Sequence, residues 1–282
     1  MEYLNLNNGT KIPAAGIGTF LLKPAEAESS VISALASGYE LIDTANAYMN
    51  EKAVGRGMKK SGLEREKIYL STKLWPSEYA VADQAIDDTL KRLDTDYIDL
   101  LFLHQPVGDY VGAYKAMERA VKDGKVKSLG LSNFSVEQIK EIVTVAEIKP
   151  AVVQVEAHPY YPQTALKEYL KEMKALIMAW YPLGHGDKAL QNEEVFAELA
   201  GKYGKSKAQI ILRWHTQVGN IVIPGSKNEA HIKDNINIFD FTLTAEEIQK
   251  IATLNKNVSY YTATKEALQG YLAFAPDFDS QE

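Results

Sequence analysis

Short apolar runs alternate with amphipathic helical segments along most of this chain. Eight runs are rich in Val, Ile and Leu and apolar almost throughout, in the order AAGIGTF, YELIDTA, KIYLSTKLW, YIDLLFLH, VKSLGLSNF, AVVQVEAH, ALIMAWYP and NIVIPGS. Such runs are typical of strands covered on both faces, as in parallel sheets. The intervening stretches predict helices over residues 26–37, 51–60, 81–93, 113–122, 136–146, 164–174 and 207–217.

This alternation favours a closed (β/α)8 TIM barrel, although an open doubly wound sheet alternates in the same way. No linker, composition shift or short repeat divides the chain, so we expect a single (β/α)8-barrel domain over residues 1–282. The stretches EYLNL and TKIPA flank Asn8-Gly9, which predicts an N-terminal β-hairpin. From about Tyr260 no strong pattern remains, and we expect a C-terminal tail over the barrel mouth.

Composition excludes several classes of function. The chain has no cysteine, which rules out disulfides, thiolate metal sites and a cysteine nucleophile. Its formal net charge of −6 and the lack of a long basic run disfavour nucleic acid as a partner. No stretch approaches the ~20 apolar residues of a membrane span, and no signal peptide begins the chain. We therefore expect a cytoplasmic protein, not bound to a membrane, with no metal site.

Four reactive side chains fall at the ends of three consecutive runs. Asp43 ends the second run, and Tyr48 lies where the next helix begins. Lys73 lies near the end of the third run, and His104 ends the fourth. Because the carboxyl ends of parallel barrel strands converge on one opening, we expect these four side chains to lie close together.

These four groups suit the protonation of an oxyanion, as carbonyl reduction requires. A free tyrosine has a pKa of about 10, and the ammonium of Lys73 would lower that of Tyr48. Asp43 would hold the lysine, and His104 would orient a substrate oxygen. Taken singly, each residue has a structural alternative: a helix cap for Asp43, a packing residue for Tyr48, a solvated charge for Lys73 and a satisfied polar group for His104.

Several motifs resemble those of one known family. The string DTANAYMNE, beginning at Asp43, resembles the second-strand signature of the aldo-keto reductases. The stretches STKLW, DYIDLLFLHQP, GLSNF, VQVEAHPYYPQ, AWYPLG and IPGSKN are similar to further family motifs, in the same order. The resemblance runs from the hairpin to about Leu254 and is to the bacterial-type members, like prostaglandin F synthase and 2,5-diketo-gluconate reductase.

The resemblance implies NADPH-dependent reduction of aldehydes and ketones by direct hydride transfer from nicotinamide to the carbonyl carbon. It implies a catalytic tetrad of Asp43, Tyr48, Lys73 and His104, with Tyr48 as general acid. It also implies that Ser132, Asn133 and Gln154 bind the nicotinamide carboxamide. The full set of expected cofactor contacts is Gly18, Thr19, Asp43, Ser132, Asn133, Gln154, Trp180, Pro182, Leu183, Asp187, Ile223, Ser226, Lys227, Asn228, His231 and Asn235.

The eighth run departs from the family pattern where the adenosine 2′-phosphate is bound. Many members carry a lysine and an arginine where this chain has Gly225 and His231. Ser226, Lys227 and Asn228 lie at an expected helix N-terminus, which favours an anion. We therefore expect NADPH as the cofactor, with NADH also possible.

We expect an apolar substrate pocket, made by Phe20, Tyr48, Trp75, His104 and Tyr110 and closed by Phe274 of the tail. The short connection after His104, with Gln105 in place of a common tryptophan, predicts an open pocket. The expected partner is a small-molecule carbonyl substrate, and the protein is expected to be a monomer or a weak homo-oligomer. Two other functions stay open: a cofactor-sensing or regulatory barrel subunit, and a lyase or isomerase that uses Lys73 as a Schiff-base amine.

Overall fold

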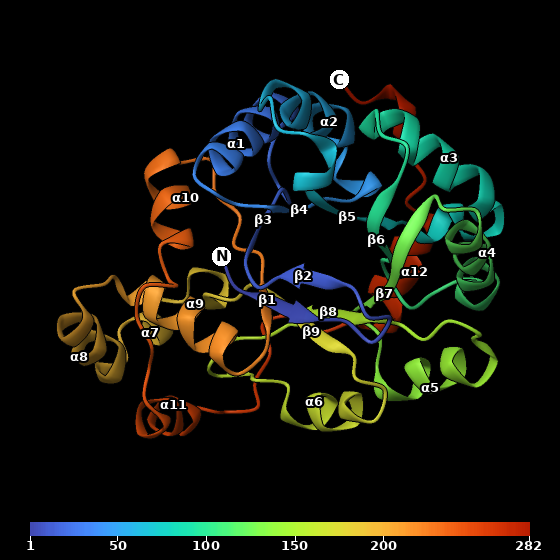
Figure 1. Cartoon of the computed structure of the whole chain (residues 1–282). Coiled ribbons are helices and arrows are strands. Elements are labelled where there is room, and N and C mark those ends of the chain that lie inside the picture. The colour runs from blue at the N-terminus through green and yellow to red at the C-terminus, as the bar shows by residue number, and fades with distance from the viewer.

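The computed structural model describes all residues, 1–282, and its centre is an eight-stranded parallel sheet (Figure 1). Neighbouring strands pair in chain order, and parallel bridges from Ala15 to Val222 and from Gly18 to Gly225 join the first strand to the last. The expected TIM barrel is therefore confirmed. Its strands are β3 (Gly16–Gly18), β4 (Leu41–Asp43), β5 (Tyr69–Leu74), β6 (Ile98–Leu103), β7 (Val126–Ser132), β8 (Val152–Glu156), β9 (Leu176–Trp180) and β10 (Ile221–Val222).

Helices surround the barrel, and the seven predicted helical segments all correspond to helices. Three helices of eight or more residues were not predicted, at Glu194–Tyr203, Ala245–Ala252 and Lys265–Ala273, whereas the helix expected after Asn228 is present at Glu229–Ile236. None of the helices is both long and apolar enough to cross a bilayer. The helices are α1 (Pro24–Ala36), α2 (Glu51–Lys60), α3 (Ala82–Leu93), α4 (Tyr110–Lys122), α5 (Val136–Val145), α6 (Thr164–Lys171), α7 (Lys188–Gln191), α8 (Glu194–Tyr203), α9 (Lys207–Gln217), α10 (Glu229–Ile236), α11 (Ala245–Ala252) and α12 (Lys265–Ala273).

The strands are apolar on both faces because each face packs in a different layer of the core. In β6, Leu100 and Phe102 belong to the cluster inside the barrel, whereas Leu101 and Leu103 pack against the outer helices. In β8, Val152 packs inside the barrel and Val153 outside it. Since side chains alternate along a strand, this register turns Gln154 of β8 into the barrel interior at the carboxyl end.

The predicted hairpin closes the opposite end of the barrel. Its strands β1 (Tyr3–Asn5) and β2 (Lys11–Pro13) form an antiparallel pair that lies across the barrel in Figure 1. Leu6 and Ile12 are buried in the inner cluster. Asn7 donates hydrogen bonds to the carbonyls of Pro150 and Met173, at or just beyond the amino-terminal ends of the strands. Because the hairpin closes the end of the barrel where the strands begin, the end where they finish is the open side.

The C-terminal segment covers part of that open side, as expected, and contains a helix that the sequence did not reveal. No residue of the helix α12 is buried, so this helix lies on the surface at the barrel mouth rather than in the core. Two contacts hold the segment before the helix: the buried carboxylate of Glu156 accepts the backbone N–H groups of Tyr260 (2.6 Å) and Tyr261 (2.9 Å). After the helix, Asp279 pairs with Arg92 at 2.9 Å.

Candidate active site

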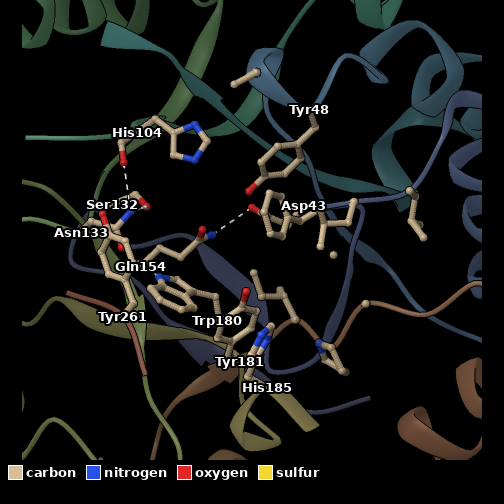
Figure 2. A pocket seen from close by; sticks show the side chains of 18 of the residues that line it. Asp43, Tyr48, His104, Ser132, Asn133, Gln154, Trp180, Tyr181, His185 and Tyr261 are labelled. Atoms are coloured by element: carbon tan, nitrogen blue, oxygen red, sulfur yellow. Dashed lines mark hydrogen bonds between the residues drawn. The ribbon is translucent and has the colours of Figure 1, made fainter. Parts of the chain in front are cut away.

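A cavity of about 1170 Å³ opens at the carboxyl ends of the strands. Asp43, Tyr48 and His104 line it, and Lys73 lies fully buried, bonded to Asp43. Figure 2 shows the phenol of Tyr48 and the imidazole of His104 projecting into the cavity. The structure thus brings together the four side chains that the sequence placed at three strand ends.

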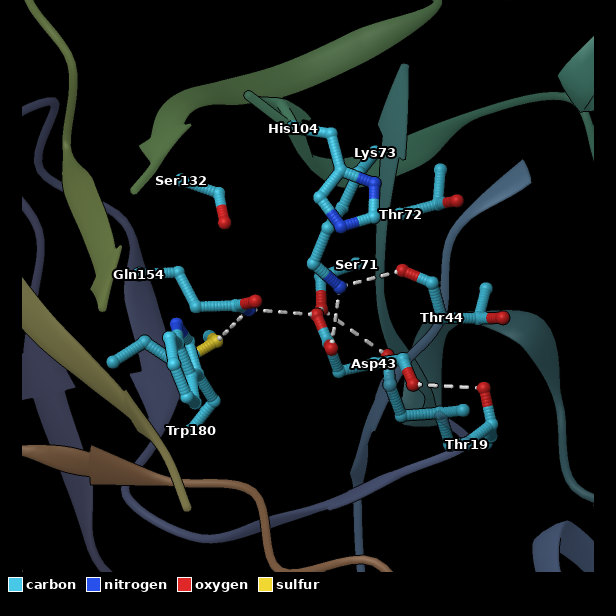
Figure 3. A network of polar contacts seen from close by, with 12 residues as sticks. Thr19, Asp43, Thr44, Ser71, Thr72, Lys73, His104, Ser132, Gln154 and Trp180 are labelled. Atoms are coloured by element: carbon cyan, nitrogen blue, oxygen red, sulfur yellow. Dashed lines mark hydrogen bonds and ion pairs between the residues drawn. The ribbon is translucent and has the colours of Figure 1, made fainter. Parts of the chain in front are cut away.

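Asp43 is the centre of a buried polar network (Figure 3). Its Oδ2 accepts a hydrogen bond from the Nζ of Lys73 at 2.6 Å, and Lys73 also donates to the carbonyl of Thr44 at 2.8 Å. Its Oδ1 accepts from the hydroxyl of Ser71 at 2.7 Å and from the amide of Gln154 at 3.0 Å. Every carboxylate oxygen is therefore used within the barrel, and Asp43 does not cap a helix.

The ion pair between Asp43 and Lys73 is held by the attraction of its charges and by the register of the strands that carry it. Burial lowers the pKa of Lys73 from its usual value, and the carboxylate of Asp43 opposes that shift. Both side chains project inward from neighbouring strands, β4 and β5, whose register is fixed by the parallel ladder. The pair therefore holds one fixed ammonium group below the cavity floor.

Tyr48 lies in a 3-10 turn, Asn46–Tyr48, directly after β4. The Nζ of Lys73 is 5.0 Å from the centre of the Tyr48 ring. The pKa of Tyr48 is nevertheless raised well above its ordinary value, first by burial and then by the charge of Asp43. The expectation that the pKa of Tyr48 is lowered is thus wrong for the protein without ligands, because burial of the phenol and the charge of Asp43 raise this pKa by more than the ammonium of Lys73 lowers it.

His104 is a neutral imidazole in this site. Burial, followed by the charge of Lys73, holds its pKa well below the usual value. Its ring packs edge-on against Trp75, with ring centres 4.8 Å apart, and against Tyr48 at 5.6 Å. The Nδ1 atom is buried with no hydrogen-bond partner. A proton is better placed on Nε2, because an N–H group buried without an acceptor is costly.

The residues expected around the nicotinamide lie in the same cavity. Ser132, Asn133, Gln154 and Trp180 all line it. The indole N–H of Trp180 donates to Oδ1 of Asn133 at 3.0 Å, and Asn133 donates to the carbonyl of His104 at 3.3 Å. The Trp180 ring is thereby tied to the strand ends that carry the tetrad.

Of the three residues in the loop after β9 that were expected to contact the cofactor, only two line the cavity. Pro182 and Leu183 line the cavity. Asp187 does not line it: its Oδ1 accepts the backbone N–H of Ala189 at 2.7 Å as the cap of α7, and its Oδ2 accepts the hydroxyl of Tyr260. Both oxygens of this carboxylate are thus already bonded, one to the backbone of α7 and one to the C-terminal segment.

The connection between β10 and α10 forms the far end of the cavity. Ile223, Ser226 and Lys227 line it. Asn228 lies outside the lining, because its Oδ1 caps α10 by accepting the N–H groups of Ala230 and His231. His231 and Asn235 lie on α10 and are also outside the lining.

Of the three remaining residues that the sequence predicted in the site, one lines the cavity and two do not. Gly18 lines the cavity and lies against β10, where a Cβ atom would meet the carbonyl of Ile223 at 2.8 Å. Thr19 is fully buried and donates to the carbonyl of Asp43 at 3.2 Å, so its side chain does not reach the cavity. Tyr110 also lies outside the cavity: as the first residue of α4 it packs on Phe134 and donates its hydroxyl to Glu141.

The substrate side of the cavity is aromatic. Phe20 and Trp75 line it as expected, and so does Phe274 of the tail. Tyr271 also lines it, and the carbonyl of Tyr271 accepts the indole N–H of Trp75 at 2.8 Å. Sequence reasoning missed Tyr271, because it predicted no helix in the C-terminal tail. It also missed Tyr181, Tyr261 and Glu26, which line the cavity as well.

The fold and the site together define a class: (β/α)8-barrel enzymes with the active site at the carboxyl ends of the strands. Residues 14–256 match the model of the aldo/keto reductase family. The chain is 42% identical to the glyoxal reductase of Bacillus subtilis (strain 168) over 260 residues, covering 91% of this chain and 94% of the relative. It is 36% identical over 256 residues to the methylglyoxal reductase DkgA of Escherichia coli (strain K12), covering 90% and 93%.

Solved structures agree with these matches. An aldo/keto reductase from Brucella melitensis superposes with a TM-score of 0.86 at 39% identity, covering 90% of this chain and 99% of that one. An aldo-keto reductase from Bombyx mori, solved in complex with NADP, superposes with a TM-score of 0.87 at 32% identity, covering 93% and 96%. The chain belongs to the aldo/keto reductase family and is an oxidoreductase.

Proposed function

We propose that this protein reduces small aldehydes and ketones to alcohols with NADPH, and that Tyr48 is the proton donor. One observation carries the proposal: Tyr48 and a neutral His104 face one cavity above the buried Asp43–Lys73 pair. We further propose that residues 1–282 act as one unit, since Tyr271 and Phe274 of the C-terminal segment line the cavity of the strand ends.

The residues of the cavity fit a nicotinamide dinucleotide. Ser132, Asn133 and Gln154 provide the donors and acceptors that a carboxamide needs, and Trp180 provides an aromatic face beside them. Ser226 and Lys227 provide a hydroxyl and a cation at the other end of the same cavity. When bound, the reduced nicotinamide supplies the hydride that reduces the carbonyl carbon.

Tyr48 keeps its proton until the substrate oxygen needs it. Its raised pKa makes the phenol a weak acid in the free site. The carbonyl oxygen becomes an alkoxide as its carbon is reduced, and an alkoxide is a stronger base than a phenolate, so the proton moves from Tyr48 to that oxygen. The ammonium of Lys73, 5.0 Å from the Tyr48 ring, stabilises the phenolate that remains.

His104 positions the reacting oxygen. With its Nδ1 buried and unpartnered, the neutral ring carries its proton on Nε2 and donates it in a hydrogen bond to the carbonyl oxygen. That bond strengthens as negative charge develops on the oxygen. The aromatic wall of Phe20, Trp75 and Phe274 suits an uncharged, apolar substrate body.

The test compares the wild-type protein with Tyr48→Phe. NADPH oxidation is followed by absorbance with methylglyoxal and with a small aromatic aldehyde, and NADPH affinity by quenching of tryptophan fluorescence. We expect Tyr48→Phe to lower kcat/KM by about 10²–10⁴-fold while leaving the affinity unchanged. The control is Tyr110→Phe, which removes a tyrosine hydroxyl outside the cavity.

Each other outcome has a defined meaning. Turnover that survives in Tyr48→Phe would show that another group donates the proton. Tight NADPH binding without turnover of any carbonyl would favour a cofactor-sensing role. A wild-type protein that binds neither NADPH nor NADH would contradict the proposed function altogether.

A further inference from the structure

The cation expected to hold the adenosine 2′-phosphate is already paired within the chain. The Nζ of Lys227 lies 2.8 Å from Oε1 of Glu26, although the two residues are 201 positions apart. Both side chains line the far end of the cavity. Lys227 holds the pKa of the Glu26 carboxyl below its usual value, so this carboxylate carries its charge at neutral pH.

The other groups that could bind a phosphate here are also engaged. Asn228 caps α10, so the backbone N–H groups of Ala230 (2.9 Å) and His231 (3.3 Å) already donate to its side chain. The hydroxyl of Ser226 accepts the N–H of Asn228 at 3.1 Å. Gly225 offers no side chain. A phosphate that enters this end must therefore compete with contacts inside the protein.

Glu26 opposes that phosphate in two ways. It occupies the ammonium group of Lys227, and its own charge repels a dianion. Lys23, three residues earlier in the chain, offsets a small part of this charge. The pair is exposed, with 68% of the Lys227 side chain and 29% of the Glu26 side chain accessible, so solvent and salt weaken it. Glu26 should thus weaken phosphate binding several-fold rather than abolish it.

We propose that Glu26 is a specificity-determining residue that narrows the preference of this enzyme for NADP(H) over NAD(H). This inference rests on the proposed function, because it takes the cavity to be the dinucleotide site. A ligand with a plain 2′-hydroxyl has no phosphate for Glu26 to repel and does not require Lys227. The enzyme is therefore expected to bind both dinucleotides, with a modest preference for the phosphorylated one.

The test is calorimetric titration of the full-length protein with NADP⁺ and with NAD⁺, in the wild type and in Glu26→Gln. Glutamine keeps the oxygen that accepts the Lys23 N–H at 3.1 Å in the capping box of α1. It removes the charge and replaces the oxygen that accepts from Lys227 by an amide NH2, so Lys227 is released. We expect the Kd for NADP⁺ to fall by about three- to tenfold and the Kd for NAD⁺ to change by less than about twofold. The change should shrink at high salt.

Two further variants make the result specific. Glu28→Gln removes the same charge from the same helix, but Glu28 pairs with Arg56 and Lys60 and does not line the cavity. It should leave the ratio of the two Kd values unchanged. Lys227→Gln should weaken NADP⁺ binding alone.

An unchanged ratio in Glu26→Gln, or the same change in Glu28→Gln, would overturn the inference while NADPH turnover left the proposed function standing. A wild-type protein that bound neither NADP⁺ nor NAD⁺ would overturn both.

Discussion

The two ends of the cavity are built differently. At the tetrad end, the Asp43 and Lys73 side chains are only 2% and 0% exposed, and both project from strands within the ladder. At the far end, Ser226 and Lys227 follow a strand of two residues, and 68% of the Lys227 side chain is exposed. The difference shows that the fold fixes the proposed proton donor and its supports. The proposed phosphate-binding end depends instead on loop side chains, which substitutions can change without disturbing the barrel.

The strongest test of this contrast is to break the buried pair. Lys73→Met leaves the Asp43 carboxylate buried without its cation, which should cost about 3–5 kcal/mol in the free energy of unfolding. It should also lower kcat/KM by about 10²–10⁴-fold, because no ammonium remains to stabilise the phenolate. Chemical denaturation and NADPH oxidation measure the two effects.

A second variant tells whether the loss of stability comes from the charge. Asp43→Asn/Lys73→Met removes both charges and should recover most of the stability but none of the activity. If the double variant were as unstable as Lys73→Met, packing rather than the unpaired carboxylate would be responsible. The buried end would then owe its rigidity to shape alone.

Loosening the C-terminal segment over the cavity should have an intermediate effect. Glu156→Gln replaces the carboxylate that accepts the N–H groups of Tyr260 and Tyr261, so one acceptor is lost and a donor faces a donor. We expect trypsin to cleave at Lys265 about tenfold faster or more, and KM for an aromatic aldehyde to rise with little change in kcat. Glu194→Gln, at an exposed site on α8 away from the cleaved bond, is the control. Equal proteolysis of both variants would show that Glu156 does not hold the segment.

The smallest expected effect concerns Glu78, below the turn that carries Tyr48. Asn46 of that turn donates to Glu78 at 2.5 Å, and burial raises the pKa of Glu78 to about 7. Because the folded state binds this proton more tightly than the unfolded chain, the stabilisation is full below about pH 4.5 and is lost as pH rises through 7.

Glu78→Gln should therefore raise Tm at pH 8 by roughly 2–4 °C relative to its effect at pH 5. Arg92, Glu51 and Asp88 are the other charged groups that act on Glu78, and Gln leaves them in place. Thermal unfolding followed by circular dichroism at both pH values measures the difference. An equal change in Tm at pH 5 and pH 8 would show that ionisation of Glu78 does not affect stability.

The sequence by itself determined the eight strands and their alternation with helices, the hairpin and the positions of Asp43, Tyr48, Lys73 and His104 at strand ends. These follow from local order: apolar strands, turn residues and the convergence of strand ends at one opening. Closure of the sheet into a barrel, which the alternation favoured over an open sheet, is seen in the bridges between the first strand and the last. The motifs that resemble the aldo-keto reductases added the family, which the comparisons confirm.

Only the tertiary structure decided what depends on contacts between distant segments. The pairing of Glu26 with Lys227 and the hold of Glu156 on the C-terminal segment join residues more than a hundred positions apart. The direction in which Tyr110 points and the raised pKa of Tyr48 also follow from packing. Periodicity shows which face of an element is buried, but it does not show which distant charge or ring lies against it.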